Sequence, residues 1–184
     1  MNLPNWLTLI RIGFVPFFVC FFYIPFFRTP HGSVILTLLF LAASLTDLLD
    51  GYLARRRSQV TPFGKFLDPV ADKILIISAL ILLVSEGHVP AWIAIIIISR
   101  EFIVTGLRMV ASLEGVVISA ESLGKYKVFF QSAAIVFLLL VLEPKLYFYE
   151  IGFFLLLLSM ILSIVSACQY FLKFGQKFHL LKTK

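Results

Sequence analysis

The sequence predicts an all-α integral membrane protein, with six transmembrane helices packed into one bundle. Of its 184 residues, 60% are hydrophobic, 20 are Phe and only 14% are charged. A soluble domain carries about 25% charged residues, so this composition indicates a chain whose surface meets lipid. One such bundle uses the whole length, and neither a linker nor an internal repeat divides it. We therefore expect a single membrane domain over residues 1–184.

Six apolar stretches define the expected helices. Segments rich in Gly, Pro and charged residues separate them and favour turns. Most stretches approach the roughly 20 residues that a spanning helix needs. The stretches are 12–27, 33–54, 63–85, 89–111, 127–142 and 146–172. Residues 2–10 precede the first stretch and are compatible with a short helix lying along the membrane surface.

The basic residues are distributed unevenly between the two ends of this bundle. The net charge is +6, and because most basic residues flank apolar stretches, contact with membrane lipids is favoured over a nucleic-acid partner. One end carries only Arg28 and Lys145. The other carries Arg11, Arg55, Arg56, Arg57, Lys65, Lys125, Lys127, Lys173, Lys177, Lys182 and Lys184. Cytoplasmic loops hold the excess of Lys and Arg, so we expect a multi-pass protein of the cytoplasmic (inner) membrane with both termini in the cytoplasm.

All four Asp residues fall between positions 47 and 72. Asp47 and Asp50 share one helix face, and so do Asp68 and Asp72. Two antiparallel helices joined by a short turn would bring the four carboxylates to a similar depth below the cytoplasmic surface. Uncompensated carboxylates are unfavourable there. Mg²⁺ or Mn²⁺ would compensate them, and a two-metal site suits displacement at phosphorus.

Pro69 leaves two alternatives open within the second half of this window. It could kink the third helix, or it could start a helix for which Asp68 is the N-cap.

The spacing D-x2-D-G-x2-A-R-x8-G-x3-D-x3-D resembles the signature of the CDP-alcohol phosphatidyltransferase family. Its fixed positions here are Asp47, Asp50, Gly51, Ala54, Arg55, Gly64, Asp68 and Asp72. The family's six-span bundle agrees with the expected layout, so the resemblance covers essentially the whole chain. The Arg100-Glu101 pair and the segment Gly124-Lys-x-Lys127 further resemble the bacterial branch that uses sn-glycerol 3-phosphate.

The resemblance implies a transferase that moves a phosphatidyl group from CDP-diacylglycerol to sn-glycerol 3-phosphate and releases CMP. It implies that the four Asp hold two Mg²⁺ or Mn²⁺ ions, and that Asp72 is also the general base. It implies a homodimer with its active site on the cytoplasmic side. The CDP-diacylglycerol site implied by the family comprises Asp47, Gly51, Ala54, Arg55 and Gly64, with Asn5, Thr8 and Arg11 as further candidates.

The acceptor phosphate needs a cation besides the metals, because the site is already rich in carboxylates. Glu101, Thr105 and Arg108 fall within about 60° of each other on the fourth helix. We predict a phosphate pocket formed by Arg108, Lys125, Lys127, Thr105 and Arg100. The alternative is an internal Arg–Glu pair that only joins helices.

Two other functions stay open at this stage. The same donor could serve another acceptor, namely phosphatidylglycerol, inositol phosphate or serine. A divalent-cation transporter could also use an Asp cluster, although the outer halves of the predicted spans are apolar, which counts against a transport pathway.

Overall fold

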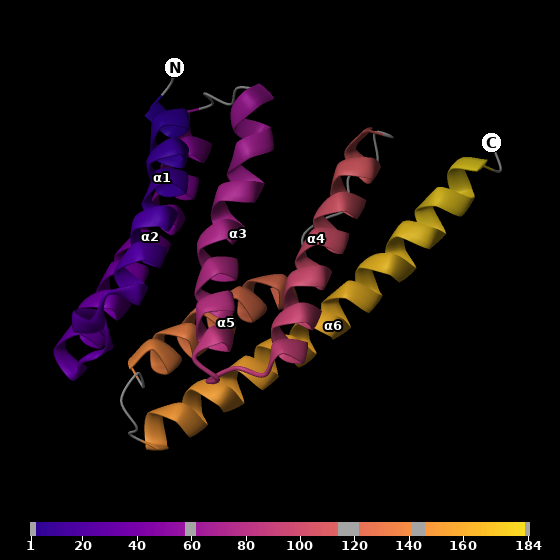
Figure 1. Ribbon diagram of the computed structural model, residues 1–184. Coiled ribbons are helices and arrows are strands. Elements are labelled where there is room, and N and C mark those ends of the chain that lie inside the picture. Colours follow the sequence, from indigo (N-terminus) through magenta and orange to yellow (C-terminus); the bar gives the residue numbers. More distant parts are fainter. Residues whose placement is uncertain (1–2, 58–61, 114–121, 141–145, 183–184) are drawn as a thin grey trace.

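The computed structural model describes the backbone of residues 3–57, 62–113, 122–140 and 146–182, and the side chains of residues 9–46, 73–112, 126–140 and 147–175. Regular secondary structure within this part of the chain is helical throughout, without a β-strand (Figure 1). The elements are α1 (Leu3–Tyr23), the 3-10 helix η1 (Pro25–Arg28), α2 (Pro30–Arg57), α3 (Pro62–Ser85), α4 (Ala91–Leu113), α5 (Ser122–Leu140) and α6 (Leu146–Lys182). The predicted all-α class is confirmed for this part of the chain.

The α-helices alternate in direction along the chain. In Figure 1, α1 descends from the N-terminus, α2 returns, and the last helix, α6, ascends to the C-terminus. The beginning of α1 and the end of α6 therefore lie at the same end of the bundle. The most extensive interface joins α5 to α6, while α3 packs against α1, α2 against α5, and α4 against α6.

The start of the chain differs from the expectation. Leu3–Tyr23 is one uninterrupted helix, so a separate N-terminal helix over residues 2–10 is wrong. Pro4 does not break it, because a proline in the first turn removes an N–H that has no helical partner. The helix ends four residues before the predicted end of the first stretch. Pro25 disfavours the helical conformation at Ile24, which is extended at φ −74° and ψ 126°.

The third helix runs through its internal proline. Pro62–Ser85 is a single α-helix that includes Pro69, so a helix beginning at Pro69 with Asp68 as its N-cap is wrong. The helix begins instead at a proline, which suits a first helical position. Beyond its end, Gly87 has φ +76°, a conformation that glycine adopts without strain and that commonly stops a helix.

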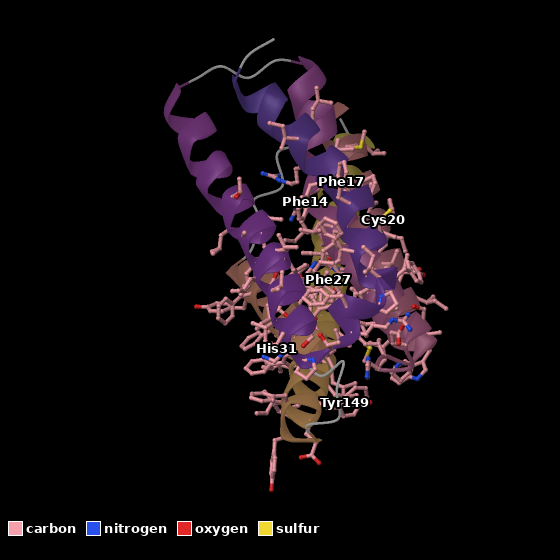
Figure 2. All side chains as sticks on the ribbon, turned by 60° about the vertical axis from the view of Figure 1, so that its left-hand side comes forward. Phe14, Phe17, Cys20, Phe27, His31 and Tyr149 are labelled. Carbon is pink, nitrogen blue, oxygen red and sulfur yellow. The ribbon has the colours of Figure 1, made fainter. Side chains whose placement is uncertain are left out.

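The bundle is apolar both inside and outside. Phe18, Phe22 and Phe40 are fully buried and belong to one continuous core. Large exposed apolar side chains lie on all six α-helices, including Phe17, Leu38, Ile81, Ile95, Phe129 and Phe154. Figure 2 shows Phe17 with Cys20, which is also exposed, on α1. Soluble monomers rarely expose so much contiguous apolar surface, so this exterior indicates contact with lipid.

Among the residues with described side chains, one helical segment is both long and apolar enough to cross a membrane. It is Tyr147–Gly175 in α6, with 29 residues and a mean hydropathy of 2.5 over its most apolar window. Shorter apolar helical segments within the described residues are Leu9–Tyr23, Pro30–Thr46, Lys73–Ser85 and Tyr126–Leu140. The structure thus describes one membrane-length apolar helix, and the six predicted spans stay a prediction.

Candidate functional site

The Asp motif lies on two consecutive helices, near the ends that are joined in sequence. Asp47 and Asp50 lie in the last three turns of α2, and Asp68 and Asp72 in the first three turns of α3. These helix ends lie at the end of the bundle where α1 begins (Figure 1). The helical backbone supports the shared face of each pair. The side chains at Asp47, Asp50, Ala54, Arg55, Asp68 and Asp72, and the surroundings of Gly51 and Gly64, lie outside the described residues. Their convergence stays a prediction.

Directly after this motif, three cationic side chains converge on one carboxylate. Lys73 of α3 follows Asp72, and its Nζ lies 3.5 Å from Glu101 Oε2. Lys127 of α5 donates a hydrogen bond to Glu101 Oε1, and Arg100 Nη1 lies 3.1 Å from the same oxygen. We call Lys73, Arg100, Glu101 and Lys127 the Glu101 cluster. It connects α3, α4 and α5.

The Glu101 cluster lies mostly inside the bundle. The exposed fraction is 4% for the Lys127 side chain, 10% for Arg100 and 13% for Glu101. Its four side chains carry three positive charges and one negative charge. Within the described part of the chain, Glu101 is the one acidic partner of both Arg100 and Lys127. Arg100 and Lys127, both largely buried, share this one carboxylate, and buried charges require compensation, so the cluster favours the arrival of an anion.

Thr105 of α4 contacts Lys73 of α3, the helix that carries Asp68 and Asp72. Its Oγ1 accepts a hydrogen bond from Lys73 Nζ and donates one of 2.7 Å to the carbonyl oxygen of Glu101, one turn earlier. Lys73 is therefore held by a hydroxyl and a carboxylate that both belong to α4. This contact fixes the position of α3 relative to α4 just beyond Asp72.

Two arginines of α4, Arg100 and Arg108, contact α6. Arg100 Nε donates to the carbonyl oxygen of Ser163, and Arg100 Nη2 donates to Ser166 Oγ, both at 2.9 Å. Arg108 Nε donates to the hydroxyl of Tyr170 at 3.2 Å, and its guanidinium carbon lies 5.0 Å from the centre of that ring. A cation over an aromatic face is an attractive contact, so both arginines help to join α4 to α6.

A pocket of about 200 Å³ lies beside the Glu101 cluster. Its polar lining comprises Arg11, Ser44, Lys73, Glu101, Lys127, Gln131 and Ser132. Arg11 and Gln131 are buried themselves, with exposed fractions of 9% and 3%. The remaining lining is apolar, including Leu75 and Ile97. A small cavity with several cations and a few polar groups suits a small anionic ligand.

The structure divides the predicted acceptor residues between two places. Lys127 lines the pocket, and Thr105 binds the pocket residue Lys73. Arg100 and Arg108 contact α6 through the bonds given above. An Arg–Glu contact is present between Arg100 and Glu101, but both residues belong to α4, so this pair does not by itself join two helices.

The remaining predicted residues are placed as follows. Arg11, expected on the donor side, lines the same pocket as Lys127. The side chains of Lys125, Asn5 and Thr8 lie outside the described residues, although Asn5 and Thr8 belong to α1.

Lys73 and Gln131 belong to this pocket, and neither was among the predicted site residues. Lys73 lies within an apolar stretch, where an ionisable residue marks a functional site by default. Gln131 follows Lys127 by four positions and therefore shares its helix face. The sequence contains both signals, but only the packing of the helices shows that Lys73 and Gln131 line the same pocket.

The opposite end of the bundle holds a separate polar contact. Arg28 Nη2, at the end of η1, donates to Glu86 Oε1 at 2.6 Å. Burial lowers the pKa of His88, and this effect outweighs the opposing influence of Glu86. Figure 2 shows His31 and Tyr149 toward this end, and the His88 ring lies 6.3 Å from that of Tyr149. These contacts connect helix ends and are remote from the Glu101 cluster.

Comparison with known proteins agrees with the pattern of the Asp motif. Residues 1–165 match the model of the CDP-alcohol phosphatidyltransferase family. The chain is 43% identical over 182 residues to the CDP-diacylglycerol–glycerol-3-phosphate 3-phosphatidyltransferase of Bacillus subtilis, covering 94% of both chains. It is 43% identical over 174 residues to the protein of the same name from Haemophilus influenzae, covering 92% of this chain and 91% of that one. The Rickettsia bellii protein of this name is 38% identical over 172 residues, covering 92% and 93%. With a family match over most of its length and relatives this similar, the chain belongs to the CDP-alcohol phosphatidyltransferase family.

Proposed function

We propose that this chain transfers the phosphatidyl group of CDP-diacylglycerol to sn-glycerol 3-phosphate, giving phosphatidylglycerophosphate and CMP. Its family and the names of its relatives in Bacillus subtilis and Haemophilus influenzae support this reaction. The structural observation that carries the proposal is the pocket beside the Glu101 cluster. It offers positive charge to a small anion directly beyond the Asp motif.

The transfer exchanges one bond at phosphorus. The acceptor hydroxyl oxygen bonds to the phosphorus that carries the diacylglycerol, and the bond from that phosphorus to the CMP oxygen breaks. We assign Asp72 as the general base that takes the hydroxyl proton. Asp72 immediately precedes Lys73, which lines the pocket. The acceptor's hydroxyl and its phosphate would thus be held by neighbouring parts of α3.

The chemistry of the Asp motif fits two divalent metal ions. Asp47, Asp50, Asp68 and Asp72 would hold Mg²⁺ or Mn²⁺, because hard cations prefer carboxylate oxygens. Their i, i+3 and i, i+4 spacings lie on helical backbone. Among residues with described side chains, no group of three His, Cys, Asp or Glu offers another metal site. Two bound ions would nearly neutralise the four carboxylates and could also bind the diphosphate oxygens of the donor.

The cytidine diphosphate of the donor is assigned to the small and basic positions of the motif. Glycine lets the helix backbone approach a ligand closely, and arginine binds phosphate oxygens in two-point fashion. The assigned residues are Asp47, Gly51, Ala54, Arg55 and Gly64, with Asn5, Thr8 and Arg11 contributed by α1. Arg11 lines the pocket together with Lys127, which supports adjacent donor and acceptor sites.

The acceptor phosphate, with a charge of about −2, is assigned to Lys127 and Lys73 in the pocket. Thr105 would add a neutral hydroxyl at its edge. Arg108 and Lys125 are retained as outer contributors, with Arg108 turning from Tyr170 toward the ligand, whereas Arg100 acts through Glu101. The pocket volume of about 200 Å³ is below the roughly 300–1,000 Å³ of sites for drug-sized ligands. This size favours glycerol 3-phosphate over phosphatidylglycerol.

The proposal also includes the setting in the membrane. We assign the six α-helices as transmembrane spans in the cytoplasmic membrane, with both termini and the active site on the cytoplasmic side. The exposed apolar faces support contact with lipid, and the distribution of basic residues supports the orientation. A homodimer is proposed from the family resemblance.

An acceptor comparison tests the reaction. The purified protein is supplied with CDP-diacylglycerol and Mg²⁺ in mixed micelles, each acceptor is offered separately, and CMP release is measured. We expect rapid release with glycerol 3-phosphate and none after chelation of the metal. Faster release with phosphatidylglycerol, inositol phosphate or serine would contradict the assigned acceptor. Metal flux into proteoliposomes without any CMP release would instead favour the transporter.

A further inference from the structure

We propose that Glu101 is a positioning residue for the acceptor: it holds the Lys127 ammonium in the pocket and sets its place relative to Lys73, the neighbour of Asp72. This inference rests on the proposed function and deepens it. None of the roles assigned above places Glu101 itself in contact with a substrate or a metal, although it lines the pocket and lies at the centre of the Glu101 cluster.

The first argument concerns the position of Lys127. Its side chain is 4% exposed, and Glu101 is its one acidic partner within the described part of the chain. Lysine has a long, flexible side chain whose charged end normally reaches toward water. An ammonium stays inside an apolar bundle only when an anion holds it there. Without Glu101, Lys127 would either turn away from the pocket or lose its charge.

The second argument concerns how the Glu101 carboxylate is itself fixed. Arg100 is held on α6 by Ser163 and Ser166, and it presents Nη1 to Glu101 Oε1 at 3.1 Å. The same oxygen accepts the Lys127 hydrogen bond. Arg100 therefore orients the carboxylate so that Lys127 meets Oε1 and the other oxygen, Oε2, faces Lys73.

The third argument concerns the spacing of the two lysines. Lys73 Nζ lies 3.5 Å from Glu101 Oε2 and also binds Thr105. One carboxylate thus determines the separation of two ammonium groups that come from α3 and α5. A phosphate placed beside both would meet a preformed pair of cations. Glu101 would remain next to the pair and would not touch the reacting atoms.

The central test is the substitution Glu101→Gln, which keeps the shape and removes the charge. We expect the KM for glycerol 3-phosphate to rise about tenfold or more, the range of a lost charge-assisted hydrogen bond. The KM for CDP-diacylglycerol should change by less than about twofold. Glu101→Asp keeps the charge on a shorter side chain and should restore part of the affinity. A double-mutant cycle with Lys127→Met should be strongly non-additive, because both changes remove the same contact.

Glu86→Gln is the matched control, since it breaks the ion pair with Arg28 at the opposite end of the bundle. It should leave both KM values unchanged. Equal changes in both KM values with Glu101→Gln, or no change in either, would overturn the positioning role. If Glu101→Gln does not fold, the KM ratio of Glu101→Asp decides the question in the same way. A wild-type protein that does not use glycerol 3-phosphate would instead overturn the proposed function, and this inference with it.

Discussion

At the scale of single residues, the chemistry depends on how charges are compensated inside an apolar bundle. Lys127 and Glu101 illustrate this, because each is mostly buried and each has the other as a partner. Without its partner, the charge of Lys127 or of Glu101 would be strongly unfavourable inside a membrane. Such groups remain in a membrane protein when they bind each other, a metal or a charged substrate. The Asp motif and the Glu101 cluster carry opposite charges, so a metal-bound diphosphate and an anionic acceptor suit adjacent sites.

The proposed base gives a prediction at this scale. Asp72→Asn keeps the size of the side chain and removes both the charge and the proton acceptor. We expect turnover to fall by about 10²–10⁴-fold, the typical contribution of a general base. Binding of CDP-diacylglycerol, measured by equilibrium dialysis in micelles, should weaken much less, because three carboxylates of the motif remain. Near-normal turnover at saturating Mg²⁺ would show that Asp72 is not the base.

The structure places some of the predicted site residues, while the chemistry of the Asp motif stays a prediction. The spacing of the four Asp followed helical periodicity, and both pairs do lie on continuous helices. Thr105 is predicted because it lies one turn from Arg108, and Lys127 because it lies at the start of the fifth helix. In the structure Lys127 belongs to the Glu101 cluster, and Thr105 contacts its member Lys73. The contact of Arg108 with Tyr170 could not be predicted, since it depends on how α4 crosses α6. Helical periodicity gives the face of one helix and not the identity of its neighbour.

At the scale of helices, glycines lie where neighbouring elements approach most closely. Gly152 of α6 faces α5, where an added Cβ would lie 2.9 Å from Leu138 Cγ. Small residues allow helices in membranes to approach closely, and α5 and α6 form the most extensive interface of the bundle. A tighter contact lies between η1 and α2. A Cβ on Gly32 would lie 2.0 Å from the carbonyl oxygen of Phe26.

The contact at Gly32 yields a prediction about stability. In Gly32→Ala, the new methyl group would also lie 2.5 Å from Phe27 Cα. Because both obstacles are backbone atoms, no side-chain rotation can relieve the clash, and η1 must shift away from α2. We expect a loss of about 1–3 kcal/mol, the usual cost of overpacking, visible as a lower Tm in detergent micelles. Gly106→Ala is the control, since a Cβ there meets nothing within 4 Å and alanine favours a helix.

Helix positions were predicted well because apolar stretches and proline-rich breaks are local signals. The exceptions occur at prolines. Ile24 leaves the helix because Pro25 follows it, whereas Pro69 remains within α3. The two prolines look alike in the sequence. What distinguishes them is the surrounding fold, since a helix can continue past proline when neighbouring helices hold it in place.

At the scale of the whole molecule, the even number of α-helices and their alternating directions bring the beginning of α1 and the end of α6 to one end (Figure 1). The Asp-bearing ends of α2 and α3 lie at this end too. The opposite end carries the Arg28–Glu86 ion pair. The sequence predicts eleven basic residues near the first end and two near the second. Of those whose side chains the structure describes, Arg11 and Lys127 are buried. Without these two, the sequence still has nine basic residues against two. This asymmetry supports the proposed orientation.

This asymmetry leads to a prediction of topology. Single cysteines are introduced as Ser58→Cys, between α2 and α3, and Lys184→Cys, in a protein whose exposed native Cys20 and Cys168 have been replaced by Ser. Both new thiols should resist a membrane-impermeant reagent in intact cells if, as proposed, the end with the basic excess faces the cytoplasm. Both should react once the membrane is permeabilised. Ser85→Cys, at the far end of α3 and exposed, is the matched control and should react in intact cells. Protection of Ser85→Cys together with labelling of either other position would reverse the orientation and move the Asp motif to the outer side, away from cytoplasmic glycerol 3-phosphate.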